Sequence, residues 1–128
     1  STIKSSGEYS GLINFNDFYA TFSDILGVID DSDGTSMMDI FLGKNSKKRD
    51  IATIYYDPMW SDNVSKYRSV FTQDNRYKLY KDGRFFDLEN DILEESPLME
   101  NSLTKEQKDI KNKLFEELSL FPDLPDTN

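Results

Sequence analysis

The sequence of 128 residues contains no cysteine and no histidine. The lack of cysteine excludes disulfide frameworks and thiolate nucleophiles, and the lack of both excludes zinc sites built on them and acid–base catalysis by imidazole. No apolar run approaches the roughly 20 residues that a membrane-spanning helix needs, so we expect no membrane partner. The absent cysteines leave the redox compartment open.

The balance of charge is acidic, but basic side chains gather in the middle of the chain. The formal net charge is −9, with 24 acidic against 15 basic residues. Residues 1–43 carry a net charge of −6, residues 44–84 carry +5 and residues 85–128 carry −8. Because a chain this acidic is poorly suited to nucleic acid, we expect none to bind. The basic middle fits either a surface for an anionic ligand or charged residues that simply alternate outward along strands.

Two helices are predicted in the first third of the chain. Across residues 15–27, Asn16 is a favourable N-cap and Gly27 is a typical C-terminal stop. The apolar residues between them share one helical face: Phe18, Phe22, Ile25 and Leu26. A shorter helix is expected from Ser36 to Leu42. The polar turn at residues 30–34 resembles a calcium loop only superficially, because isoleucines stand at its first and last ligand positions.

After residue 50 the pattern changes to that of β-strands. Four runs rich in β-branched and aromatic residues are predicted as strands, at 51–56, 67–72, 76–80 and 84–88. Turn signals at Asp74-Asn75 and Asp82-Gly83 join the last three tightly. Consecutive strands joined in this way form an antiparallel meander.

A C-terminal helix completes the predicted fold. Thr104 and Gln107 form a capping-box pattern that opens a helix running to about Leu120. Its apolar stripe consists of Ile110, Leu114, Leu118 and Phe121. The sequence therefore predicts an α+β fold, in which a C-terminal helix packs on a four-stranded antiparallel sheet and one or two helices precede the sheet.

The candidate site lies around the break between the first two predicted strands. Six aromatic or charged side chains gather there: Tyr55, Tyr56, Asp57, Trp60, Tyr67 and Arg68. Aromatic faces and an arginine suit contact with a sugar or an anion, although aromatics on a half-buried sheet are also ordinary core residues. Asp57 has no partner carboxylate at the spacing of an acid–base pair, and the sequence has no glycine-rich phosphate loop or nucleophile-elbow serine. The residues alone thus indicate a binding or structural module without catalytic residues.

Four segments, in order, resemble motifs of the sulfatase family. Residues 16–28 resemble the segment D-x-x-P-T-L-x-x-x-x-G, and residues 33–44 resemble D-G-x-S-x-x-x-L-L-x-G. Residues 68–80 resemble the strand pair R-x-V-R-x-x-R-Y-K-L-I, and residues 85–94 resemble E-L-Y-D-L-x-x-D-P-x-E. Two departures are Ala20 and Ile92, which stand where the family has proline.

The family's catalytic residues have no counterpart in this sequence. Sulfatases use a formylglycine made from the Cys or Ser of C/S-x-P-x-R, and that motif is absent. The family's calcium ligands and its catalytic His and Lys lie upstream of the matched region. The resemblance therefore implies the last quarter of a sulfatase, with residues 1–44 as the end of the catalytic domain and residues 45–128 as the C-terminal subdomain. It implies no cofactor or metal in this chain, while the parent enzyme holds calcium and formylglycine.

The resemblance also implies a function. The chain would be the C-terminal portion of a sulfuric ester hydrolase, inactive alone, whose partner is the missing N-terminal catalytic domain. Its contacts to a sulfated carbohydrate at the rim of the substrate pocket would be Tyr56, Asp57, Trp60 and Arg68. Two alternatives stay open: a free-standing acidic binding or regulatory module, and the same subdomain of a phosphate or phosphonate hydrolase. The compartment is unknown, although many bacterial relatives are exported to the periplasm or outside the cell.

Overall fold

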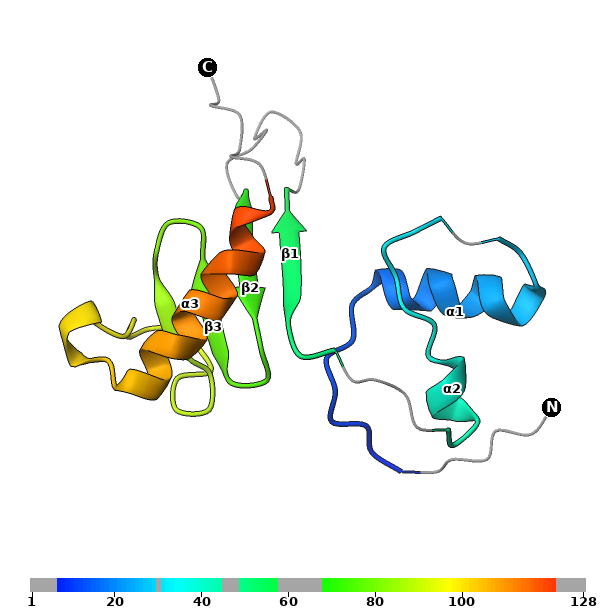
Figure 1. Ribbon diagram of the computed structural model, residues 1–128, viewed down its shortest axis with the longest axis horizontal. Helices are drawn as coiled ribbons and strands as arrows, with labels where there is room; N and C mark the ends of the chain where they lie inside the picture. Colours follow the sequence, from blue (N-terminus) through cyan, green and yellow to red (C-terminus); the bar gives the residue numbers. More distant parts are fainter. Residues whose placement is uncertain (1–6, 30, 45–48, 58–67, 122–128) are drawn as a thin grey trace, which may run out of the picture. The chain divides into compact units, whose positions relative to one another are not determined.

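The computed structural model describes residues 7–29, 31–44, 49–57 and 68–121. The chain divides into two compact units, residues 1–50 and 51–128 (Figure 1). The first unit contains α1 (Asn16–Leu26) and α2 (Met38–Phe41). The second contains β1 (Ala52–Tyr56), β2 (Ser69–Gln73), β3 (Tyr77–Tyr80), β4 (Phe85–Asp87), the 3-10 helix η1 (Glu100–Ser102) and α3 (Lys105–Ser119). Each predicted helix and strand is present, with ends within two residues of the predicted ones.

The sheet of the second unit is the predicted antiparallel meander. Its strands lie in the order β1-β2-β3-β4, and every neighbouring pair is antiparallel. The tight turn between β3 and β4 depends on Gly83, whose φ of 92° lies in the region that favours glycine. The amide of Gly83 donates to the carbonyl of Tyr80, which closes this turn.

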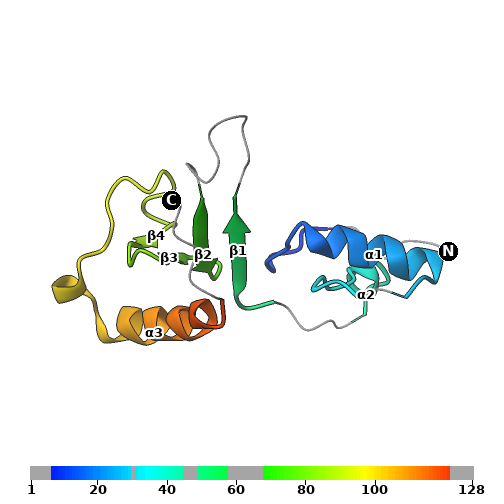
Figure 2. The same ribbon diagram turned by 90° about the horizontal axis from the view of Figure 1, so that it is seen from above.

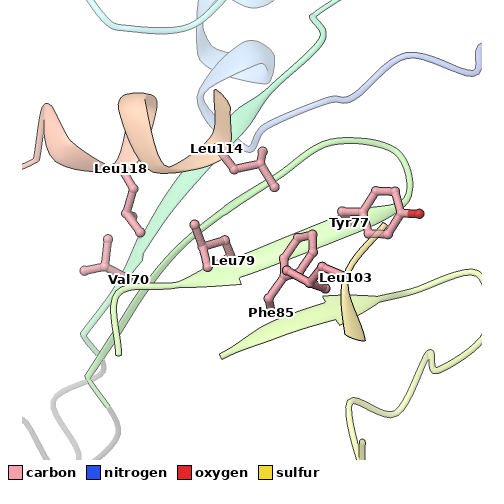
Figure 3. Close-up of a cluster of buried hydrophobic side chains, with 7 residues drawn as sticks. All are labelled: Val70, Tyr77, Leu79, Phe85, Leu103, Leu114 and Leu118. Carbon is pink, nitrogen blue, oxygen red and sulfur yellow. The ribbon is translucent and has the colours of Figure 1, made fainter. Parts of the chain in front are cut away.

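The main core of the second unit lies between α3 and one face of the sheet (Figures 1 and 2). Figure 3 shows its side chains, which come from three strands, the segment before α3, and α3 itself: Val70, Tyr77, Leu79, Phe85, Leu103, Leu114 and Leu118. The predicted capping box is present, because Thr104 and Gln107 each accept a hydrogen bond from the other's backbone amide. Phe121, predicted on the apolar stripe, lies beyond the last turn of α3 and is partly exposed.

In the first unit, α1 presents its polar side inward and its apolar side outward. The side chains that it buries belong to Asp17, Ala20, Thr21 and Ser23. The predicted apolar stripe is instead exposed at Phe18, Phe22, Ile25 and Leu26. The predicted N-cap is also wrong: Phe15 occupies that position and makes no side-chain cap, because Asn16 already lies within the helix. Gly27 ends the helix with a left-handed φ of 66°, as predicted.

Asp17 organises the first unit. Its buried carboxylate accepts hydrogen bonds from the amides of Asn14, at 2.7 Å, and Thr35, at 2.8 Å. Arg49 binds both carboxylate oxygens, with nitrogen–oxygen distances of 2.5 and 2.7 Å. Gly34 lies against α1 so closely that an added Cβ would stand 2.3 Å from the carbonyl oxygen of Asn16. The motifs at residues 16–28 and 33–44 therefore meet as one packed and hydrogen-bonded structure.

Candidate functional site

The predicted site residues that the structure describes lie where β1 ends and β2 begins. The antiparallel register pairs Tyr56 with Ser69, which places Asp57 and Arg68 opposite each other one position further along. Trp60 and Tyr67 lie outside the described residues. The structure thus brings together Asp57 and Arg68, which are 11 residues apart in the sequence.

Asp57 and Arg68 form an ion pair with little exposure to solvent. The Nε and Nη2 atoms of Arg68 each lie 3.0 Å from Oδ2 of Asp57. The side chains are 21% exposed for Asp57 and 14% exposed for Arg68. The hydrogen bond with Asp57 raises the pKa of Arg68 above its ordinary value. Arg68 therefore stays charged at any physiological pH, with a neighbouring carboxylate that compensates its charge and fixes its orientation.

The second carboxylate oxygen of Asp57, Oδ1, differs from Oδ2 in its hydrogen bonding. Within the part of the chain that the structure describes, Oδ1 of Asp57 is buried and has no hydrogen-bond partner. A buried acceptor without a donor costs free energy, so such an atom is unusual in a folded protein. This oxygen is able to accept a hydrogen bond from a donor that the described residues do not supply.

The two tyrosines of the predicted cluster do not form one aromatic surface. Tyr55 pairs with Val70, whose side chain is part of the core beneath α3. Because side chains alternate along a strand, Tyr55 lies on the α3 side of the sheet and Tyr56 on the opposite side. Both are half exposed. Tyr56 is therefore the tyrosine that shares its face of the sheet with Phe71 and the polar residues described next.

Lys78, which is buried, and Glu94, which is partly buried, form an ion pair on the sheet face opposite α3. The Nζ atom of Lys78 lies 2.7 Å from a carboxylate oxygen of Glu94 and 3.9 Å from the ring centre of Phe71. The hydroxyl of Tyr80 donates to the other oxygen of Glu94 at 2.5 Å. Burial alone raises the pKa of Glu94, but the hydrogen bonds from Lys78 and Tyr80 lower it below its ordinary value overall.

The backbone of Glu94 is strained in this position. Its φ of 58° is the one left-handed value among the non-glycine residues that the structure describes. Glu94 occupies the last position of the segment that resembles D-P-x-E, and its partner Lys78 lies within the segment that resembles R-Y-K-L. The two motifs thus fix the loop after β4 against the sheet.

Arg76 and Asp87 link the same two motifs at the other end of β3. Two nitrogens of Arg76 bind the two carboxylate oxygens of Asp87 at 2.9 and 2.7 Å. The hydrogen bonds from Arg76, and after it from Asn90, lower the pKa of Asp87 from 3.8 to about 2. The sequence does not reveal this pair, because each residue lies in a separate motif and only the strand register brings them together.

The lowered pKa of Asp87 predicts a loss of stability in acid. Since the folded state favours the ionised carboxylate, this stabilisation is complete above the ordinary pKa of 3.8 and disappears as the pH falls towards about 2. Denaturant unfolding measured across this range should show a smaller acid-dependent loss for Asp87→Asn than for the unchanged protein. The control is Asp82→Asn, whose carboxylate is exposed. Equal pH dependence in all three proteins would contradict the prediction.

The described residues also bear on metal and membrane binding. Among residues 7–29, 31–44, 49–57 and 68–121, no three acidic side chains gather into a group that could hold a metal ion. Within the same ranges, no helix has the length and apolar character needed to cross a bilayer.

Comparison with known proteins gives matches in structure but not in sequence. No protein-family model matches the sequence, and no curated protein matches it. The structure of BT4656 in complex with its substrate D-glucosamine-2-N,6-O-disulfate matches with a TM-score of 0.61 at 23% identity, over 80% of this chain. The phosphonate monoester hydrolase of Agrobacterium radiobacter matches with a TM-score of 0.61 at 19% identity, over 81% of this chain.

The match covers only a part of each of these proteins. The chain corresponds to 23% of the length of BT4656 and to 23% of the length of the phosphonate monoester hydrolase. At this level of identity the two matches confirm the predicted resemblance for the fold. The chain therefore has the fold of one part of BT4656 and of one part of the phosphonate monoester hydrolase.

Proposed function

We propose that the chain is the C-terminal portion of a sulfatase-like sulfuric ester hydrolase, in which residues 1–44 end the catalytic domain and residues 45–128 form the C-terminal subdomain. One observation carries the proposal. The chain shares its fold with part of BT4656 and part of the phosphonate monoester hydrolase. Within this fold, ion pairs are formed by residues of the sulfatase-like motifs: Asp17, Arg76, Lys78, Asp87 and Glu94. Its role is to support the catalytic domain and to line the rim of the substrate pocket.

The rim role uses the residues at the ends of β1 and β2. Arg68 would donate hydrogen bonds to a sulfate or sugar oxygen, with Asp57 as the positioning residue that holds its guanidinium. Tyr56 would offer its half-exposed ring to a sugar, and Trp60 would belong to the same rim. The net charge of +5 over residues 44–84 would attract a sulfated carbohydrate to this side of the pocket.

The chemistry of ester cleavage would come from the preceding domain. In sulfatases, formylglycine supplies the nucleophile and calcium stabilises the sulfate charge. On the resemblance, we place both in the part of the catalytic domain that precedes this chain and assign no reaction step to these residues.

A second candidate is the same subdomain in a phosphonate or phosphate monoester hydrolase. The match to the Agrobacterium enzyme is as good in TM-score as the match to BT4656. The Asp57–Arg68 pair does not separate the two, because sulfate and phosphonate esters both present oxygens that an arginine binds.

The proposal predicts different activities for the chain alone and for the longer protein. The gene upstream of Ser1 should encode C/S-x-P-x-R in the same reading frame, and the longer product should hydrolyse an aryl sulfate. The 128-residue chain alone should give no turnover. Turnover of an aryl phosphonate monoester but not of an aryl sulfate would favour the second candidate. A natural start codon at residue 1, or turnover by the chain alone, would overturn the proposal.

The same longer protein tests the rim. Arg68→Ala should lower kcat/KM for a sulfated sugar by about tenfold through loss of a charged hydrogen bond. The control is Arg84→Ala, which removes an exposed arginine paired with Asp82 in the same unit. Equal effects of the two substitutions would contradict the rim role of Arg68.

A further inference from the structure

The outward side of α1 is a large apolar surface. Its exposed side chains come from four aromatic and two aliphatic residues, each between 47% and 87% exposed: Phe15, Phe18, Tyr19, Phe22, Ile25 and Leu26. We call these six residues the α1 outer face. The inward side of the same helix is polar and already satisfied, because Asp17 and Thr21 are hydrogen-bonded to neighbouring segments. The helix thus has its polar side inward and its apolar side outward, which is the reverse of an ordinary surface helix.

The spacing of these residues places them on one continuous face. At 3.6 residues per turn, the six positions fall within an arc of about 120° around the helix axis. A two-helix coiled coil uses a narrower seam of a and d positions only. The breadth of the α1 outer face therefore suits a layer of secondary structure, such as the face of a sheet, better than a single helix.

The area is sufficient for a stable interface. Taking about 200 Å² for each whole side chain, the exposed fractions of these six side chains correspond to roughly 750 Å² of apolar surface. Monomeric proteins rarely expose apolar patches larger than a few hundred Å², whereas a stable interface buries about 800 Å² on each partner. A surface of this size is expected to be covered in the working protein.

Charge and chain length indicate which partner covers it. The first unit, residues 1–50, has eight acidic and five basic residues and a net charge of −3. Two copies of it therefore repel each other, whereas a partner with a basic rim is attracted. More than three quarters of each matched hydrolase lies outside the match with this chain. A polypeptide of that length is large enough to supply an apolar layer.

We propose that the α1 outer face is the docking surface for the part of the catalytic domain that precedes this chain, through a broad apolar layer with basic side chains at its rim. The inference rests on the proposed function and adds the place and the chemistry of the interface. Once docked, Phe18 and Phe22 lie in the core of the whole enzyme. The helices of the first unit are then the last elements of the catalytic domain before the sheet that follows.

Hydroxyl-radical footprinting read by mass spectrometry tests the proposal without any substitution. Phe22 and Phe115 are both 61% exposed and both lie on helices, so Phe115 on α3 is a matched internal control. In the 128-residue chain both rings should be oxidised at similar rates. In the longer protein Phe18, Tyr19 and Phe22 should lose most of their oxidation, while Phe115 should keep it.

A pair of substitutions gives a second measurement. Phe22→Ser should lower the melting temperature of the longer protein but not that of the 128-residue chain, because the ring is buried only in the former. Phe115→Ser should leave both unchanged.

Three outcomes would overturn the inference. Phe22 as reactive as Phe115 in the longer protein would show that nothing covers the face. If light scattering showed a stable dimer of the 128-residue chain and footprinting showed the α1 outer face protected, a second copy would be the partner that covers this face. If the face were protected from oxidation in a monomer of that chain, residues of the chain itself would cover it. The proposed function is judged separately, by the upstream reading frame and ester hydrolysis, so the two can fail independently.

Discussion

The substitution Asp17→Ala is expected to unfold the first unit at neutral pH. Arg49 would lose its bidentate partner, and the amides of Asn14 and Thr35 would lose their acceptor. Removing one partner of a buried ion pair costs about 3–5 kcal/mol, because the remaining charge stays buried and uncompensated. Amide hydrogen exchange should show loss of protection in α1, while the amides of β3 and β4 in the second unit keep theirs.

The control for this experiment is Asp39→Ala in the same unit. Asp39 pairs with Lys44, and both side chains are more than half exposed. An exposed ion pair contributes about 0–1 kcal/mol, so α1 should keep its protection in this variant. Similar effects of the two substitutions would contradict the central role of Asp17.

The pH dependence of the first unit provides a related check. Burial raises the pKa of Asp17, but the hydrogen bonds from Arg49, Thr35 and Asn14 together lower it below its ordinary value of 3.8. Because the folded-state pKa is depressed, the ion pair stabilises the unit above about pH 4 and this contribution is lost as the pH falls further. Protection of α1 in the unchanged protein should therefore weaken in acid.

The second large effect is expected from Leu114→Ala in the core beneath α3. Leu114 is 1% exposed and lies among Val70, Leu79 and Phe85 in Figure 3. Truncating a buried leucine costs about 2–5 kcal/mol, from lost burial and from the cavity left behind. A unit of this size has a total stability of about 5–15 kcal/mol at most, so the substitution removes a large share of it. Urea unfolding followed by far-UV circular dichroism should show a lower midpoint.

Leu120→Ala is the matched control, since it makes the same truncation just beyond the same helix. Leu120 is 76% exposed, so its loss should change the unfolding free energy by less than about 0.5 kcal/mol. If both variants unfolded at the same denaturant concentration, α3 would not be the element that closes the core.

The second unit was predictable from its sequence to an unusual degree. Strand patterns are local, and the Asp82-Gly83 turn allows one register for the strands that it joins. Because each strand pairs with the next one in the chain, the meander needs no knowledge of distant contacts. The capping box of α3 is equally local, and it is present as predicted.

The candidate site was predictable in part. Asp57 and Arg68 were both selected from the sequence, and the structure joins them as an ion pair. The pairing itself was not expected, because it depends on the β1–β2 register across the intervening residues.

The role of Arg49 in the first unit was not predicted. Its partner Asp17 is 32 residues away, and no pattern in the segment around Arg49 marks it as different from the neighbouring lysines.

For this protein, the sequence by itself determined the elements, their order and the antiparallel meander, since hydrophobic period, caps and turns act over a few residues. Only the tertiary structure decided what each face of α1 contacts. Helical spacing identifies an apolar stripe, but it does not say whether that stripe lies inside this chain. Here the hydrogen bonds of Asp17 draw the polar side inward, and Phe18 and Phe22 are left at the surface. Burial is a property of the whole assembly, so a pattern within one helix cannot specify it.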